Sequence, residues 1–327
     1  MTHPTQSAAR AAAQGLGLAL RAPGLLLSVL AVTVIGAAPF VMAVEGPVMD
    51  SLAVQPPVSS LAPSEVDPEW WQEFQRHASG LAATFAPMIL GFAAPLESVS
   101  ALLDGTRRPL AMMAPVAVSA LLWAFLWGGV LHRFFSGAGS PRAFMAAGAR
   151  HFRGMLAITA MAAAVSVGLY LTVHAWLFGV VYDSIASRVP SERDAFLARV
   201  ILYLVFGALL VTSNAVFSFA RIQVVSSQRH VLFAVAAAWA LVRRELSSVL
   251  ALYVIFLVIF GAAMTAYGAA ELLGGARIGG WRAVAIGQAF VLFRLFLRLA
   301  FSAAQVNFAT SVAPLPPAPD HASTPPA

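Results

Sequence analysis

Long apolar stretches, separated by shorter polar connections, set the hydrophobic pattern of this chain. Six of them run for about 20 residues or more, the length of helix that crosses a hydrocarbon core about 30 Å thick. We expect these spans at residues 24–44, 110–131, 155–181, 199–220, 248–268 and 283–303. The pattern predicts an all-α integral membrane protein folded as a six-transmembrane-helix bundle.

The composition agrees with a membrane protein and excludes an ordinary soluble domain. Residues of the AVILMFWYC set make up 60% of the 327 residues and charged residues 10%, whereas a soluble domain is about 25% charged. The chain contains no cysteine, which excludes disulfides, thiolate metal sites and cysteine nucleophiles. We found no cofactor signature and expect no cofactor.

The distribution of arginine predicts which connections are cytoplasmic. The terminal segments and every second connection contain ten arginines and two acidic residues, whereas the remaining connections contain eight arginines and twelve acidic residues. The arginine-rich segments are residues 1–23, 132–154, 221–247 and 304–327. Because basic loops stay on the cytoplasmic side, we expect a multi-pass protein of the bacterial inner membrane with both termini in the cytoplasm.

One membrane domain accounts for most of the chain. We expect it to cover residues 1–312, with an outer loop at 45–109 and a disordered, Pro-rich cytoplasmic tail at 313–327. Prolines interrupt a further apolar stretch, and a span there would move an arginine-rich loop outside. We therefore interpret 80–94 as re-entrant or interfacial and expect a short outer helix after it that ends at Gly105.

Three cytoplasmic segments share one layout, a basic, Ala-rich amphipathic helix that leads into a span. We expect these elbow helices at about 8–21, 141–153 and 228–244, the second capped by Ser140 with Pro141 in its first turn. Arginines on such helices would contact anionic headgroups. Those residues are Arg150, Arg153, Arg243 and Arg244. The alternative is that any cytoplasmic loop of this protein is basic and Ala-rich.

Two short motifs accompany this layout, Trp127-Gly128-Gly129-x-x-His132-Arg133 and Phe219-Ala220-Arg221. With them, most of residues 10–312 resembles uncharacterised bacterial six-span membrane protein families. More distantly, it is similar to the membrane domain found beside some glycerophosphodiester phosphodiesterases. The resemblance implies a multi-span bacterial membrane protein and brings no catalytic residues with it, since the soluble phosphodiesterase barrel and its acidic metal ligands are absent.

Two arginines inside the last span are the most informative candidate site. Arg294 and Arg298 are four residues apart, so they share a helical face. A charge within the membrane costs at least about 2.5 kcal/mol unless it is paired or reaches the headgroups. The functional interpretation is a site for an anionic ligand or a lipid headgroup. The alternative is that both side chains extend to the membrane surface or bond to carbonyls, Glu97 or Glu271.

A polar stripe in the fourth span extends the candidate ligand site. Asn214, Ser218 and Arg221 follow one another at helical spacing toward the cytoplasm. They would line a polar pathway if they face a cavity. The alternative is that they form hydrogen bonds between helices, each worth about 0.6 kcal/mol.

A short helix in the outer loop carries the only candidate metal ligands. Asp67 caps this helix, and Glu69, Glu73 and His77 fall on one of its faces. Three such side chains are able to contribute ligands to a divalent metal. The alternative is a solvated polar face above an aromatic anchor, because no fourth ligand is evident.

Three functional hypotheses remain open from the sequence. The first is a non-enzymatic transport or transport-accessory protein with an anionic ligand or lipid-headgroup site. The second is a membrane scaffold or sensor that binds a membrane or cytoplasmic partner protein. The third is a lipid-modifying enzyme, which would need carboxylates or histidines that converge at one membrane face. Membrane lipids are partners in all three, and nothing indicates nucleic-acid binding.

Overall fold

A computed structural model describes residues 7–54, 67–84, 100–105, 110–137, 140–227, 230–274 and 281–312. Helices dominate these residues, and no strand occurs among them. Six helical stretches are long and apolar enough to cross a membrane. They are α2 (Pro23–Val54), α5 (Met113–Ser136), the run from α6 to α7 (Pro141–Ala186), α8 (Glu192–Ser227), α10 (Leu246–Gly274) and α11 (Trp281–Val312). The predicted all-α, six-span fold is confirmed.

Several helices extend beyond the predicted spans. Helix α2 continues to Val54 and so includes the first residues of the predicted outer loop, with Pro39 and Pro47 inside it. Proline is tolerated within membrane helices because neighbouring groups satisfy the freed backbone. The remaining loop contains α3 (Pro68–His77) and the short turns η1 (Ala82–Thr84) and η2 (Leu110–Met112). Residues 85–99, which include most of the predicted re-entrant segment, and the tail at 313–327 lie outside the described residues.

The second predicted elbow helix is not a separate element. Helix α6 (Pro141–Leu169) runs without a break from its cap into the span, and the Oγ of Ser140 accepts a hydrogen bond from the backbone N–H of Ala143 at 3.2 Å. Two π-helical turns follow, η3 (Tyr170–His174) and η4 (Leu177–Val181), before α7 (Tyr182–Ala186). The expected boundary near residue 153 is wrong because Gly154, which stands there, is tolerated inside α6, where an added Cβ would lie 2.9 Å from the side chain of Val224.

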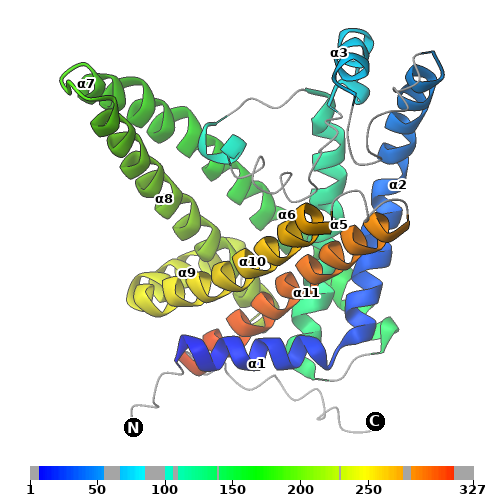
Figure 1. Cartoon of the computed structure of the whole chain (residues 1–327). Helices are drawn as coiled ribbons and strands as arrows, with labels where there is room; N and C mark the ends of the chain where they lie inside the picture. The colour runs from blue at the N-terminus through cyan, green and yellow to red at the C-terminus, as the bar shows by residue number, and fades with distance from the viewer. Residues whose placement is uncertain are drawn as a thin grey trace, which may run out of the picture.

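The first and third elbow helices are separate elements, α1 (Ala8–Leu20) and α9 (Val231–Arg244). Helix α1 lies across the last turns of α11, at the same end of the bundle (Figure 1). A Cβ added to Gly15 would lie 2.5 Å from the carbonyl oxygen of Ala300, so the two backbones touch. Helix α1 therefore packs against the bundle through its small residues and does not only rest on lipid.

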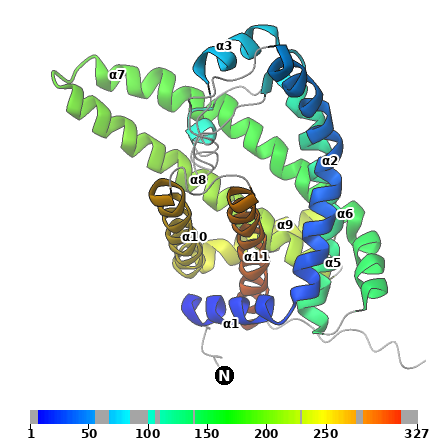
Figure 2. The same ribbon diagram turned by 45° about the vertical axis from the view of Figure 1, so that its right-hand side comes forward.

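The two ends of the molecule are packed differently. We call the end with α1, α9 and the last turns of α11 the proximal end, and the end with α3 and α7 the distal end. One large core, which includes the proximal end, joins buried residues of α1, α2, α5, α6, α8, α9, α10 and α11. Toward the distal end, the hairpin of α6, α7 and α8 diverges from α2, α3 and α5 (Figures 1 and 2). Two small clusters, one under α3 and one between α6 and α8, occur there.

Candidate functional site

Two arginines from different helices meet the same tryptophan beside the proximal core. Arg298 of α11 places its Cζ 3.3 Å from the ring centre of Trp123 and 5.3 Å from that of Trp127, both on α5. Arg221 of α8 places its Cζ 5.9 Å from the ring centre of Trp127. A guanidinium over a tryptophan face gains about 0.5–2 kcal/mol, more when water is excluded. The tryptophans thus hold both cations within the membrane-spanning part of the fold.

No carboxylate neutralises this pair among the described residues. The ion pairs found there involve Arg76, His77 and Arg244, all away from α5. The buried Nε of Arg221 has no hydrogen-bond partner in the protein. The site therefore keeps donor capacity for an anionic group, and binding such a group would offset the cost of an unpaired charge within a membrane.

Two adjoining cavities expose these guanidiniums to a ligand. A cavity of about 410 Å³ lies between α5, α6, α8 and α11, and Ser119 and Thr159 are among the residues that line it. A smaller one of about 140 Å³ lies between α5, α8 and α11. Arg221, Arg298 and Trp127 line both. The larger volume lies within the range of about 300–1,000 Å³ that is usual for small-molecule sites.

Neutral polar groups complete the smaller cavity. Asn214, Ser218, Ser302 and Gln305 line it. The Nδ2 of Asn214 donates to the hydroxyl of Tyr253 on α10 at 3.0 Å, and Ser218 and Gln305 lie close to the same hydroxyl. The buried Nε2 of Gln305 has no hydrogen-bond partner. The predicted stripe of α8 therefore faces a cavity shared with Arg298.

Several of these residues were not predicted from the sequence. Ser302 and Gln305 follow Arg298 at i+4 and i+7, so they continue its helical face. This spacing in the sequence was enough to predict that they lie beside Arg298. Trp123 and Trp127 also form an i, i+4 pair, with ring centres 5.4 Å apart. Tyr253 carries no such signal, because only the packing of α10 against α11, where its ring lies 4.8 Å from that of Phe301, brings it to the site.

Arg294 lies one turn before Arg298 but is placed differently. Both residues are exposed, but Arg294 lines neither cavity, whereas Arg298 lines both. One of its proposed acidic partners, Glu97, and the side chain of the other, Glu271, lie outside the described residues. The structure therefore brings Arg298 together with Arg221, Asn214 and Ser218, while Arg294 stays apart.

The four arginines expected to contact headgroups are all exposed toward the proximal end. Arg244 is engaged by the protein, since its Nη2 lies 3.5 Å from the carbonyl oxygen of Val312 and its Nε 3.4 Å from the carboxylate of Glu245. This arginine thus links α9 to the end of α11. Headgroup contact by Arg150, Arg153 and Arg243 stays a prediction.

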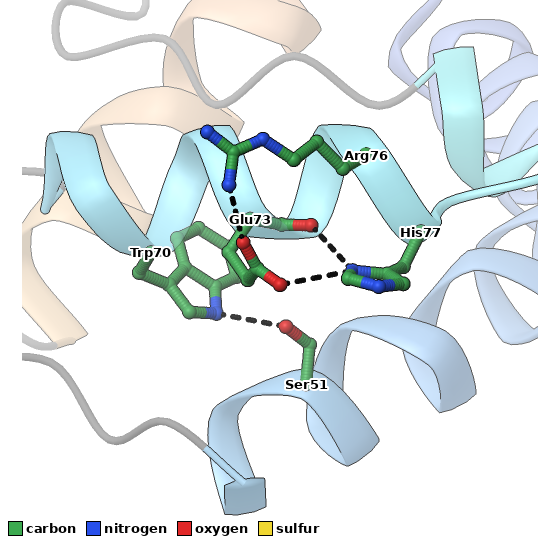
Figure 3. Close-up of polar contacts among 5 residues, drawn as sticks. All are labelled: Ser51, Trp70, Glu73, Arg76 and His77. Carbon is green, nitrogen blue, oxygen red and sulfur yellow. Dashed lines mark hydrogen bonds and ion pairs between the residues drawn. The ribbon is translucent and has the colours of Figure 1, made fainter.

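The candidate metal ligands on α3 do not assemble into a metal site. The carboxylate of Glu73 lies 2.8 Å from Arg76 and 3.2 Å from His77 (Figure 3). Glu69 is exposed. Within the described part of the chain, no group of three or more His, Asp or Glu side chains is placed to hold a metal ion. The Nε1 of Trp70 donates to the Oγ of Ser51 at 3.1 Å, which anchors α3 on α2.

A helical turn at residues 100–105 is held at the distal end between η3 and α8. The hydroxyl of Tyr203 donates to the carboxylate of Asp104, and the ring of His174 lies 2.8 Å from the carbonyl oxygen of Leu103. The hydrogen bond from Tyr203, with a second from Ser100, lowers the pKa of Asp104. The turn ends at Gly105 with a φ of +63°, as the sequence predicted.

Comparisons with known proteins identify no relative of this chain. No protein-family model, no curated protein and no solved structure matches the chain. The functional argument therefore depends on the chemistry of the site. Its two cavities are lined by guanidinium, hydroxyl, amide and aromatic groups, without a carboxylate or a histidine among their lining residues.

Proposed function

We propose that this protein is a non-enzymatic transport or transport-accessory protein of the bacterial inner membrane. It binds an anionic group, such as a phosphate, between Arg221 and Arg298, and its termini are cytoplasmic. The observation that supports this proposal most strongly is that two guanidiniums lie near Trp127 and line the same cavity. Neither has an acidic partner among the described residues.

Anion binding follows from the cost of the unpaired charges. An arginine in the bilayer is stabilised by a partner, and its planar fork suits the oxygens of a phosphate or carboxylate. Ser119 and Asn214 line the same cavities, and the hydroxyl of Ser119 and the second amide N–H of Asn214 supply hydrogen-bond donors for the remaining oxygens. The same chemistry would accept a soluble phosphate or the phosphate of a lipid headgroup.

Binding fits the site better than catalysis does. A lipid-modifying enzyme needs a general base or a metal, and the residues that line the two cavities include no carboxylate or histidine. A scaffold without a ligand would not need two unpaired arginines beside a cavity. The bias of arginine toward the proximal connections supports the proposed orientation.

Ligand-dependent stabilisation tests the proposal. We would measure the melting temperature of the detergent-purified protein with inorganic phosphate, glycerol 3-phosphate, phosphatidic acid or phosphatidylcholine. At least one anionic ligand is expected to raise it, and phosphatidylcholine is not. Stabilisation by the soluble anions indicates a soluble substrate, and stabilisation by phosphatidic acid alone indicates a lipid headgroup.

Arg298→Leu and Arg294→Leu form a matched pair, because each removes one positive charge from the same helix. Arg298→Leu should weaken binding by about ten- to a hundredfold, since hydrogen bonds to charged groups are worth about 1.5–3 kcal/mol. Arg294→Leu should leave it unchanged. Equal losses in the two variants, or no stabilisation of the wild-type protein by any anion, would contradict the proposed site.

A further inference from the structure

A second basic cavity lies at the proximal end, between the starts of α2 and α6 and the end of α5. Its volume is about 400 Å³, and its lining includes Arg21, Arg133, Ser28 and Phe144. It shares no lining residue with the two cavities around Arg298. It is therefore a separate place in the fold, and an argument about it does not depend on the proposed function.

This basic cavity continues into an apolar groove. The groove, of about 610 Å³, runs between α2 and α5, and Val32 and Leu126 line both spaces. Farther from the arginines it is lined mainly by apolar residues of α2 and α5, and Glu45 stands toward its distal end. The two spaces together are cationic at the proximal end and apolar in the middle, with an acidic residue at the distal end.

The dimensions match one leaflet of a bilayer. From Pro23, where α2 begins, to Val32 the helix rises about 14 Å, close to half of a hydrocarbon core about 30 Å thick. A group bound at Arg21 would thus lie near the membrane surface, and a chain that runs along α2 would reach Val32 near the midplane. This is the reach of a phospholipid acyl chain in its own leaflet.

The two arginines are free to receive a phosphate. Arg21 is exposed and Arg133 half-buried, and neither forms an ion pair with a carboxylate in the described part of the chain. The Nη1 of Arg133 donates to the carbonyl oxygen of Gly137, which orients the guanidinium and leaves its other donors available. At the opposite end, Glu45 disfavours an anionic headgroup, so charge fixes the orientation of an amphiphile in this space.

From this geometry we propose that the protein binds one anionic phospholipid of the leaflet at the proximal end. The phosphate lies between Arg21 and Arg133. One acyl chain follows the first turns of α2 past Ser28 to Val32, and its end enters the groove between α2 and α5. The lipid thereby fills the seam between α1, α2, α5 and α6.

Native mass spectrometry with palmitoyl-oleoyl-phosphatidylglycerol tests this site in the full-length protein. The double variant Arg21→Gln/Arg133→Gln should bind this lipid about twenty- to thirtyfold more weakly, since each basic residue near anionic headgroups contributes about fivefold. Binding of the matching phosphatidylcholine should not change. The control variant Arg10→Gln/Arg142→Gln removes two exposed arginines of the same end that do not line the cavity, and it should retain wild-type affinity.

A second variant tests where the acyl chain lies without changing charge. Val32→Phe adds bulk where the cavity and the groove meet, so it should weaken binding of phosphatidylglycerol while both arginines remain. Unchanged affinity in the double variant would overturn the proposal, as would equal losses in the control variant. Arg298→Leu separates the two sites, because it should not alter the loss caused by the double variant even if the proposed anion site proves wrong.

Discussion

The proximal and distal ends of this molecule use the same apolar residue types to different effect. At the proximal end, Phe219 and Phe308 are completely buried in a core shared by eight helices. At the distal end, large side chains such as Val180, Phe196 and Leu204 are mostly exposed on the diverging hairpin. In lipid, an apolar side chain gains little by leaving the solvent, so only close packing holds helices together. The buried contacts of the proximal end therefore carry the stability of the fold.

The candidate anion site lies at the border between these two regions. Arg221 comes directly after the buried pair Phe219 and Ala220, and Arg298 lies next to buried Leu299. Side chains on rigid, packed elements hold a binding geometry better than side chains on loops. The dense core thus positions the arginines, while the more open region beside them leaves space for a ligand.

The largest effect that separates the two regions is expected from matched phenylalanines of α8. Phe219→Ala should lower the free energy of unfolding by about 3–5 kcal/mol, because it leaves a cavity beside Phe308 in the core. Phe196→Ala should change it by less than about 0.5 kcal/mol, because its side chain is 64% exposed. Equilibrium denaturation in detergent micelles measures both. Similar losses would show that the distal hairpin is as tightly packed as the proximal core.

Two glycines of α1 give the next largest difference. Gly15→Ala should destabilise the protein by about 1–3 kcal/mol, since its new Cβ would meet the backbone of α11 at 2.5 Å. Gly17→Ala should be neutral or stabilise by up to about 1 kcal/mol, because nothing lies within 4 Å and alanine favours a helix. Melting temperatures of the two variants compare them directly. A tolerated Gly15→Ala would mean that α1 is not firmly packed on the bundle.

The sequence predicts the six helices well because lipid imposes one strong rule, a long apolar helix for every crossing. It misjudges the elbow at 141–153, since a basic, Ala-rich segment is equally compatible with a separate helix and with the first turns of the span. By contrast, α9 is separate from α10, and the chain changes direction at Glu245. Periodicity finds helices, but it does not fix where a continuous helix enters the membrane.

The site is only partly predictable for a similar reason. Helical spacing places Arg294 and Arg298 on one face. The two side chains nevertheless point about 40° apart around the helix axis, because four residues make slightly more than one full turn. Which of the two meets a partner depends on the tryptophans of α5, and no local pattern encodes that packing. Asn214, Ser218 and Arg221 were found because their spacing lies within one helix. Tyr253 was missed because it comes from another helix.

A smaller effect is expected at the distal turn, where Asp104 is held by Tyr203 and Ser100. Asp104→Asn should loosen residues 100–105 by about 1 kcal/mol or less, measured as faster amide exchange in this turn. The folded-state pKa of Asp104 is lowered from 3.8, so its contribution is present above that value and is lost as pH falls through the lowered pKa. Asp183→Asn, an exposed change at the same end, is the control and should not alter exchange in the turn.

The smallest effect is expected on α3, where the visible ion pairs contribute less than the aromatic anchor. Glu73 pairs with Arg76 and His77, but all three side chains are substantially exposed, and such pairs are worth about 0–1 kcal/mol. Glu73→Gln should therefore change the free energy of unfolding by less than about 0.5 kcal/mol. Zn²⁺ should not shift the melting temperature of the wild-type protein or of this variant. Phe74→Ala removes the buried ring that stacks on Trp70, so it should lower the free energy of unfolding by more than Glu73→Gln does. A larger loss in Glu73→Gln than in Phe74→Ala would show that charge, and not aromatic packing, holds the distal cap on α2.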